Sequence, residues 1–383
     1  MGDIASVKAG DIAPKKAFFS ETGVSFIRAG SLSRLIAGES ACFLERISAE
    51  TASELGMHLF PKGTILFAKS GMSCMTGNVY VLQEPCYVVS HLACVTTNNT
   101  DLSLYLKHFF RWNRPSELIE NPAFPSIRLS KIASMELNLP DHGQIAKQVL
   151  ILERVEGLTE ACRHQLSLLD DLVKSRFVEM FESTKWSTAP AGSVLLNMRN
   201  GVSPSKAGAF RARVLTLSAI TQGFFDAESW KEGTFSSDPP RGKRISAGEF
   251  YICRGNGNRD LVGAGEYSDI DYLDLVFPDT MIAARINLDL INAAYLRYAW
   301  TRPAVRRQIE SRVRTTNGTF KINQRMLSEV LLPIPPLSLQ REFAAFAAEV
   351  AKSRVVVKKQ ALKYNDVIRA SSETAIIRRG GLA

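Results

Sequence analysis

Motifs for metal binding, disulfide formation, secretion and membrane insertion are missing from this sequence of 383 residues. Its six cysteines include no CxxC pair, and its five histidines show neither HxxxH nor HxH spacing, so neither a zinc site nor a disulfide framework is expected. The first residues, MGDIASVKAGDIAPKK, lack the apolar segment of a secretory signal, and nowhere do about 18 apolar residues run together. With a hydrophobic fraction of 45% and a charged fraction of 22%, the sequence predicts a cytoplasmic globular protein with room for two domains.

Local signatures of enzymes are also missing. The sequence has no GxSxG, HExxH or GxGxxG motif, and no GxxxxGK followed by Ser or Thr. NPAF, at residues 121–124, resembles the NPPF or NPPY signature of amino-methyltransferases, but Ala123 replaces the second proline and no FxGxG-type cofactor loop follows a strand. We therefore interpret NPAF as a turn and predict no catalytic residue, no metal site and no bound cofactor.

An excess of basic residues is the first positive feature. The net charge is +9 and the pI is near 9.3. Because neutralising phosphates releases counterions and drives binding, this balance favours a polyanionic partner, with nucleic acid as the leading candidate.

Two long amphipathic helices are predicted from apolar residues spaced three and four apart. The first covers about residues 144–182, with Val155, Leu158 and Cys162 in its apolar stripe, and the second follows LLPIPPLSLQ near the end of the sequence. Helices of this length are expected to pack along each other as in a coiled coil. The residues predicted for this contact, and for docking of partner subunits, are Val155, Leu166, Leu169, Val173, Phe177, Val350, Val357 and Ile368.

The two halves of the sequence match each other. A shift of 195 residues places Val155 on Val350 and Val173 on Ile368. Earlier segments match in the same order, at shifts of 185 to 193: 126–140 with 319–333, YLKHFFRW from Tyr105 with YLRYAWTR from Tyr295, KGTILFAKSG from Lys62 with AGEFYICRGN from Ala247, and FIRAGSLS from Phe26 with VLTLSAIT from Val214. We infer an internal duplication of a globular domain followed by a long helix.

Each globular repeat is predicted to mix strands and helices. GVSFIRAGSL, GTILFAKSG, RVLTLSAI and GEFYICRGNGN are typical of strands that end in glycine-containing turns. DLSLYLKHFFRW and DLINAAYLRYAW are typical of helices whose N-caps are their aspartates. The expected fold class is α+β.

Basic and amide-rich loops are the candidate DNA contacts. In RGNGNRD, residues 254–260, Arg can donate to guanine and Asn can pair with adenine, although an ordinary solvated turn explains the loop equally well. The segment ESRVRTTNGTFKIN, residues 310–323, and the loop AKSGMSCMTGN of the first repeat have similar donors. The predicted DNA-binding residues are Arg28, Lys69, Ser70, Asn78, Arg254, Asn256, Asn258, Arg259, Arg312, Arg314, Thr316, Asn317 and Lys321.

IPPLSLQREF, residues 334–343, and LVKSRFVEMF, residues 172–181, together with the repeat, resemble the specificity (S) subunits of type I restriction–modification enzymes. The resemblance covers nearly the full sequence. It implies two target recognition domains, at 1–140 and 186–336, and two spacer helices, at 141–185 and 337–383, that form an antiparallel coiled coil with a pseudo-two-fold axis. One departure is the entry to the first helix, NLPDHGQIAKQ, where Gln144 is expected to correspond to Gln340.

What the resemblance implies about function is specific. Each recognition domain is expected to bind one half of a bipartite site in double-stranded DNA, and the helices are expected to set the spacing and dock methyltransferase (M) subunits. Methylation with S-adenosylmethionine, and ATP- and Mg-dependent restriction, would belong to the M and restriction (R) subunits, so the chain itself is expected to be non-catalytic. Two alternatives remain at this stage: a methylation-only complex, and a basic coiled-coil scaffold without sequence-selective DNA binding.

Overall fold

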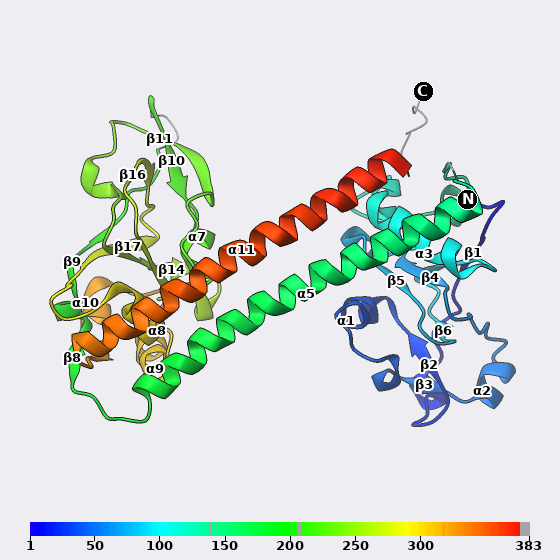
Figure 1. Cartoon of the computed structure of the whole chain (residues 1–383), viewed down its shortest axis with the longest axis horizontal. Coiled ribbons are helices and arrows are strands. Elements are labelled where there is room, and N and C mark those ends of the chain that lie inside the picture. Colours follow the sequence, from blue (N-terminus) through cyan, green and yellow to red (C-terminus); the bar gives the residue numbers. More distant parts are fainter. Residues whose placement is uncertain (138, 206–207, 317, 376–383) are drawn as a thin grey trace. The chain divides into compact units, whose positions relative to one another are not determined.

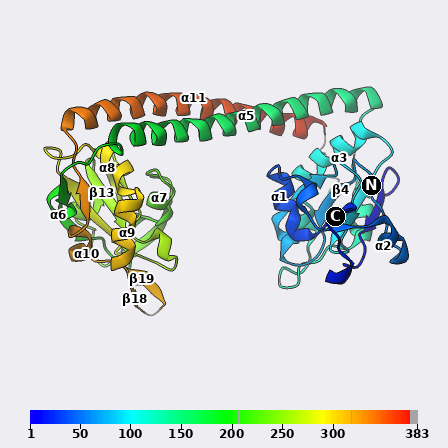
Figure 2. The ribbon, with the colours of Figure 1, turned by 90° about the horizontal axis from the view of Figure 1, so that it is seen from below.

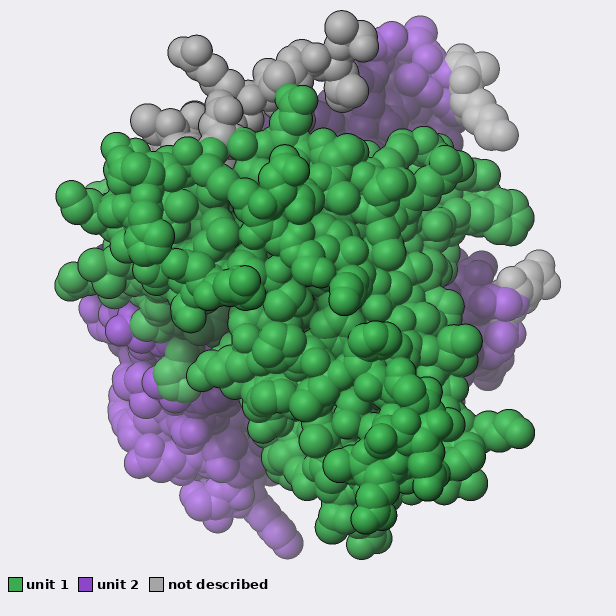
Figure 3. All heavy atoms as spheres, turned by 90° about the vertical axis from the view of Figure 1, so that its right-hand side faces the viewer, with its two compact units in different colours: residues 1–164, 358–383 green, residues 165–357 purple. Residues whose placement is uncertain are grey.

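The computed structural model describes residues 1–137, 139–205, 208–316 and 318–375. The chain divides into two compact units, unit 1 (residues 1–164 and 358–383) and unit 2 (residues 165–357), which are coloured separately in Figure 3. The divisions fall inside two long helices, α5 (His142–Phe181) and α11 (Leu337–Ala375), drawn in green and in orange to red in Figure 1. Each unit therefore contains a globular part and a portion of both long helices.

The globular part of unit 1 is built on a four-stranded sheet in the order β1-β7-β4-β5, in which every neighbouring pair is antiparallel. Its strands are β1 (Ser6–Ala9), β4 (Ile65–Ala68), β5 (Val79–Val81) and β7 (Leu92–Thr96). A smaller sheet contains β2 (Val24–Ile27), β3 (Arg46–Ile47) and β6 (Tyr87–Val88). The helices are α1 (Leu32–Ile36), α2 (Ala49–Glu54), α3 (Thr100–Trp112) and α4 (Leu129–Ala133).

The globular part of unit 2 also has a four-stranded antiparallel sheet, in the order β9-β17-β13-β15. Its strands are β9 (Leu195–Asn200), β13 (Glu249–Cys253), β15 (Gly265–Ser268) and β17 (Met281–Ile286). Three further sheets contain β8 (Thr188–Pro190), β10 (Phe210–Leu215), β11 (Trp230–Phe235), β12 (Arg244–Ile245), β14 (Gly255–Asn256), β16 (Tyr272–Val276), β18 (Arg314–Thr316), β19 (Thr319–Lys321) and β20 (Leu331–Pro333). The shorter helices are α6 (Ala191–Val194), α7 (Ser218–Thr221), α8 (Ala293–Trp300), α9 (Pro303–Arg312) and α10 (Gln324–Ser328).

The two large sheets have the same strand order and the same strand directions. In each sheet a fully buried strand, β4 or β13, pairs with two neighbours, and the strand of that sheet that comes first in the sequence, β1 or β9, lies at one edge. A glycine follows each edge strand where the backbone passes close to another segment. A Cβ at Gly10 would lie 2.1 Å from the carbonyl oxygen of Val88, and one at Gly201 would lie 2.1 Å from that of Pro278. Only glycine fits at both positions.

The helix starts correct two details of the sequence prediction. Helices α4 and α10 begin at Leu129 and Gln324, which gives a shift of 195 residues instead of the predicted 193. The predicted aspartate N-caps are also wrong. The caps are Asn99, whose side chain accepts a hydrogen bond from the N–H of Leu102, and Asn292, which does the same at α8. An asparagine in extended conformation just before the first turn is a strong cap, and it places Asp101 within the first turn.

The predicted stripe of the long helices is largely buried. Val155, Val173, Phe177 and Val350 are buried, and Leu166, Leu169, Val357 and Ile368 are half-buried. The stripe was wrong at one position, because Leu158 is 39% exposed while Thr159 is 4% exposed. The Thr159 hydroxyl donates to the carbonyl oxygen of Val155 at 2.9 Å, which allows a polar side chain to be buried there. Among the described residues, no helix has an apolar stretch long enough to cross a bilayer.

Candidate nucleic-acid interface

Two basic loops that were predicted separately come together in unit 2. The strands β14, β19 and β18 form one antiparallel sheet, in which Gly255 and Arg314 both pair with Lys321, and Asn256 pairs with Phe320. Figure 2 shows β18 and β19 at the end of unit 2 opposite its portions of the long helices. Arg314 and Lys321 are exposed there, so this small sheet carries solvent-accessible positive charge.

Several of the predicted contact residues in unit 2 hold the loop itself in shape. The Asn256 side-chain oxygen accepts from the N–H of Asn258 at 2.8 Å, and the Asn258 oxygen accepts from the N–H of Asp260 at 3.0 Å. Arg254 donates to the carbonyl oxygen of Asp279 at 3.1 Å, and Arg259 donates to another backbone carbonyl at 3.3 Å. These hydrogen bonds hold the loop in one conformation, because a side chain that bonds to nearby backbone groups restricts the backbone there.

Three predicted residues of unit 2 remain, Arg312, Thr316 and Asn317. Arg312 donates to the carbonyl oxygen of Gln308 at 2.8 Å, within its own helix. Asn317 lies outside the described residues, and only the backbone of Thr316 is described. Arg306 was not among the predicted residues, but its guanidinium donates to the carbonyl oxygens of Val262 and Asp260 and so connects the loop to α9. The pair Arg306–Arg307 was visible in the sequence, but nothing there indicated which arginine faces the loop.

The loop of unit 1 that begins at Lys69 pairs with a later segment in the same way as the loop of unit 2 that begins at Arg254. Ser70 and Ser126 form an antiparallel bridge, as Gly255 and Lys321 do in unit 2. The N–H of Gly71 donates to the carbonyl oxygen of Pro125 at 3.0 Å, so the loop that begins at Lys69 lies against residues 121–127. The Ser70 hydroxyl is 2.7 Å from His91 Nδ1.

Asn78 and Arg28 are held elsewhere in unit 1. The Asn78 side chain donates to the Ser33 hydroxyl at 3.0 Å. Arg28 forms an ion pair with Glu45 at 2.6 Å, and its guanidinium lies over the rings of Phe19 and Phe26, at 5.3 and 5.4 Å from their centroids. These contacts give Arg28 a packing role, because ion pairing and two cation–π contacts fix its charged group.

NPAF forms the turn that was predicted for it. The Asn121 side-chain oxygen accepts from the N–H of Ala123 at 3.0 Å, and its carbonyl oxygen accepts from the N–H of Phe124 at 3.2 Å. Phe124 is 81% exposed and Met72, on the neighbouring loop, is 72% exposed. Neither large apolar side chain was among the predicted DNA contacts, because only basic, amide and hydroxyl side chains were considered.

Ionic groups join α3 to α5 in unit 1. Lys107 pairs with both Glu153 and Glu156, Arg111 pairs with Glu156, and His108 Nε2 lies 2.8 Å from Glu153. The hydrogen bond from His108 and the ammonium of Lys107 lower the pKa of Glu153 to about 2, while burial lowers the pKa of His108. The carboxylates and the imidazole lie close enough together to hold a metal ion. Since the Lys107 ammonium already contacts both carboxylates, the cluster is better suited to an internal salt-bridge network.

A pocket of about 410 Å³ adjoins this cluster. It is lined by His108, Arg111, Trp112, Arg114, Leu152, Glu156, Thr159, Arg163, Asn365 and Ile368. Leu152 comes from α5 and Ile368 comes from α11, so unit 1 brings the first part of one long helix beside the last part of the other.

In unit 2, aromatic side chains join α5 to the globular part, as ionic groups do in unit 1. The Phe177 ring of α5 lies 5.5 Å from the ring of Tyr295 in α8 and 5.3 Å from that of Phe343 in α11. Phe177 therefore packs on the globular part as well as on the other long helix, whereas the sequence analysis had assigned it to the helix pair alone. The Tyr295 ring is stacked on Phe177 and the Phe343 ring lies edge to face with it, and such ring pairs add to the stability that comes from burying their area.

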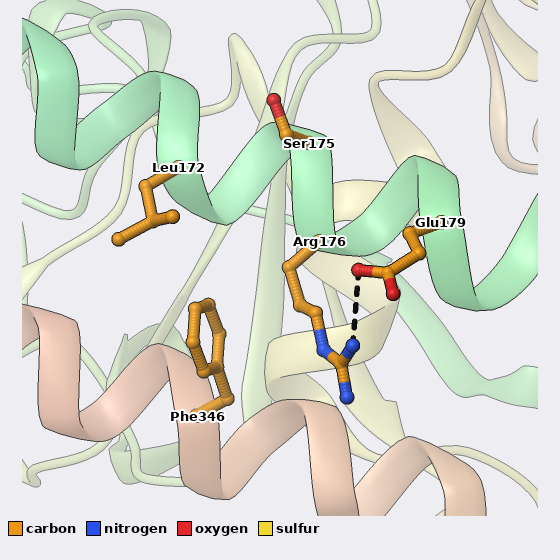
Figure 4. Close-up of a pocket in the computed structure, with 5 residues that line it drawn as sticks. All are labelled: Leu172, Ser175, Arg176, Glu179 and Phe346. Atoms are coloured by element: carbon orange, nitrogen blue, oxygen red, sulfur yellow. Dashed lines mark hydrogen bonds and ion pairs between the residues drawn. The ribbon is translucent and has the colours of Figure 1, made fainter.

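Polar contacts continue along the same helix pair in unit 2. Arg176 reaches from α5 to Glu342 of α11 at 3.0 Å and to Glu179 of its own helix at 2.9 Å, and Arg354 pairs with Asp170. A shallow pocket of about 550 Å³ lies beside these residues. Figure 4 shows Leu172, Ser175, Arg176 and Glu179 on one helix and Phe346 on the facing helix.

A buried glutamine marks the start of α11. Gln340 is fully buried; its amide nitrogen donates to the carbonyl oxygens of Leu290 and Pro335, at 3.2 and 2.8 Å, and its oxygen accepts from the N–H of Asn292 at 2.7 Å. Gln144 does not correspond to it. Gln144 is exposed, and the shift of 195 residues places Ile145 at that position.

Comparisons with known proteins agree with this architecture. Residues 1–167 match the family described as type I restriction modification DNA specificity domain. The type I restriction enzyme EcoKI specificity subunit of Escherichia coli (strain K12) is 24% identical over 171 residues, which are 44% of this chain and 36% of that protein. The chain thus matches little more than a third of this relative's length.

One solved structure shows a likeness of fold along nearly the whole chain. The S subunit of a type I restriction-modification system from M. genitalium matches 98% of this chain and 95% of its own, with a TM-score of 0.57 and 12% identity. A second structure, described as showing complex assembly and conformational transition of the type I R-M system, covers 98% of this chain and 95% of its own, with a TM-score of 0.48 and 14% identity.

Proposed function

We propose that this chain is the DNA-specificity subunit of a type I restriction–modification complex, since its residues 1–167 match the family described as type I restriction modification DNA specificity domain. The observation that carries the proposal is the placement of equivalent loops on two similar sheets. In each unit the loop after the buried central strand pairs with a later segment, at Ser70 and Ser126 in one and at Gly255 and Lys321 in the other. Two such surfaces suit a DNA site with two halves.

The two units are halves of an internal duplication. Support comes from the shared sheet order, the glycines Gly10 and Gly201, the asparagine caps of α3 and α8, and the shift of 195 residues that relates α4 to α10. Unrelated domains would not be expected to share a buried close approach, a cap and a topology in the same order.

The long helices form an antiparallel coiled coil that sets the spacing between the half-sites and docks methyltransferase subunits. In unit 2, residues late in α5 contact residues early in α11, as at Phe177 and Phe343. In unit 1, residues early in α5 line a pocket with residues late in α11, as at Leu152 and Ile368. Both contacts are those of antiparallel helices, and the stripe from Val155 to Phe177, with Thr159 in place of Leu158, is buried or half-buried as such a seam requires.

The chain contributes binding and leaves the chemistry to its partners. Methyl transfer from S-adenosylmethionine, and restriction driven by ATP and Mg, would reside in the methyltransferase and restriction subunits. On this chain, Arg314 and Lys321 are the exposed donors that would meet phosphate or base edges, and in unit 1 Lys69 lies at the position of Arg254, beside the bridge between Ser70 and Ser126. Arg254, Asn256, Asn258 and Arg259 would act mainly by holding their loop in the conformation that DNA meets.

Mapping methylated adenines in cells with and without this gene tests the proposal. The expected result is a bipartite motif that is methylated only when the gene is present. An unchanged methylation map would refute the proposal and favour a scaffold without sequence-selective binding. A motif that is methylated without any restriction of unmodified DNA would identify the methylation-only form of the complex.

A further inference from the structure

Two large exposed apolar side chains of unit 1, Met72 and Phe124, each lie two residues from a bridged pair of serines. Ser70 and Ser126 are bridged, and the N–H of Gly71 donates to the carbonyl oxygen of Pro125. Met72 and Phe124 come next on these antiparallel segments, and they are 72% and 81% exposed. Folding alone does not account for them, because a turn of this kind needs no large apolar residue at its tip.

The position of this tip in the shared topology is informative. With Ser70 on Gly255 and Ser126 on Lys321, the two bridges superpose, and Met72 and Phe124 fall on Gly257 and Thr319. In unit 2 Thr319 belongs to the small sheet that carries Arg314 and Lys321, and Gly257 directly follows β14 of that sheet. The tip of unit 1 therefore lies where the tip of unit 2 presents charge and hydrogen-bond donors, but its own chemistry is apolar.

Cations surround the tip in unit 1. Lys69 begins one of the two segments, Arg128 is exposed four residues after Phe124, and Lys131 forms an ion pair with Glu120. An apolar tip with an exposed arginine and two half-buried lysines close to it in the sequence suits duplex DNA, where cations meet phosphates and the apolar groups meet bases. It suits an apolar protein partner less well, because burying these cations would require matching acids.

Building on the proposed function, we propose that Phe124 and Met72 recognise the half-site of unit 1 by apolar contact with its bases. Such side chains discriminate either by packing on thymine methyl groups or by entering a flexible base step and partly unstacking it. The half-site of unit 1 would then be selected by methyl groups and deformability, and that of unit 2 by hydrogen bonds.

The test uses the full chain, purified from its own cells with the subunits it retains. Duplexes with a randomised central segment are selected on wild-type protein, on Phe124→Ala, on Met72→Ala and on Phe43→Ala. Phe43 is the matched control, because it is 74% exposed in the same unit and its 3-10 helix, Ala41–Phe43, packs on β2. A fourth variant, Arg314→Ala with Lys321→Ala, reports on unit 2.

Phe124→Ala is expected to weaken binding to the selected site about 10-fold and to erase preference in one half-site only, since removing one base contact by an aromatic ring costs about that much. Its melting temperature should equal that of the wild type, because the ring is exposed. Replacing thymine with uracil removes the methyl group and so tests methyl contact. Placing 2-aminopurine at the preferred step tests unstacking. A positive result with either probe supports the proposal.

Two different results would overturn the proposal, and only one of them would also overturn the proposed function. If Phe124→Ala and Met72→Ala keep both half-site preferences while the Arg314 and Lys321 variant loses one, the tip has no role and the proposed function stands. If wild-type protein selects no sequence at all, the proposed function fails, and this inference fails with it.

Discussion

The side-chain oxygen of Gln340 accepts a hydrogen bond from the backbone N–H of Asn292 at 2.7 Å, which joins the start of α11 to the capping residue of α8. The same amide donates to two carbonyl oxygens, so one fully buried side chain satisfies three backbone groups. These bonds pair backbone groups around a buried side chain and fix how the long helix leaves unit 2.

Gln340→Ala should therefore lower the free energy of unfolding of the protein by about 3 kcal/mol, because it leaves buried polar groups unpaired and opens a cavity. Gln144→Ala, at the exposed glutamine of α5, is the matched control and should change it by less than about 0.5 kcal/mol. Urea denaturation followed by circular dichroism measures both. Equal effects would contradict the assignment of a special role to Gln340.

The cluster around Glu153 should contribute to stability in a defined pH range. The pKa of this carboxyl group falls to about 2 from its ordinary value of 4.5, so the folded state binds the proton less readily than the unfolded chain. The contribution is complete above about pH 4.5 and is lost as the pH falls towards 2. Glu153→Gln should destabilise the protein at pH 6 and much less at pH 3, as measured by urea unfolding. Glu160→Gln, which removes an exposed partner of Arg163, should show no such dependence.

Glu266 should act in the opposite sense. Burial raises its pKa to about 7 although Arg297 lies 3.0 Å away. The folded state then binds the proton more tightly than the unfolded chain, so stability falls as the pH rises from about 4.5 to about 7. In Glu266→Gln this decline should be reduced, and thermal melts at pH 5 and pH 8 would measure it. A wild-type protein equally stable at both pH values, with a variant that matches it, would contradict the prediction.

The small sheet of unit 2 should carry part of the salt dependence of DNA binding. Arg314→Ala combined with Lys321→Ala should lower affinity and reduce the slope of log K against log salt by about 2, because each lost phosphate contact removes about one released counterion. Arg341→Ala removes an exposed charge from α11 and is the control. Fluorescence anisotropy over a salt series is the measurement, and an unchanged slope in the double variant would exclude phosphate contact.

Lengthening both long helices should lengthen the spacing between the half-sites. Seven residues inserted after Glu160 and after Val355, positions related by the shift of 195 residues, add about 10 Å to each helix and preserve the apolar stripe. The site should then tolerate about three more base pairs between its halves, at about 3.4 Å per base pair. Methylation mapping gives the spacing directly. A folded variant with unchanged spacing would show that the helices do not act as a ruler.

The sequence by itself determined the features that arise from local periodicity and from repetition. The 3/4 spacing of apolar residues identified both long helices, and the buried strands and the segment-by-segment match of the halves followed from patterns that need no knowledge of distant contacts. The resemblance to specificity subunits rested on the same patterns. The fold class was therefore predictable, as were the turn at NPAF and most of the buried stripe.

Tertiary structure alone decided the features that depend on which residues meet. It replaced Leu158 with Thr159 in the buried stripe, because the hydroxyl can bond to the preceding turn, and it distinguished the buried Gln340 from the exposed Gln144. It also joined the loops at Gly255 and Lys321 into one sheet, and it gave the asparagines of the first loop a role in holding the backbone. Spacing along a chain records which face of a helix or strand is apolar, but hydrogen bonds and close approaches between distant segments exist only once the chain has folded.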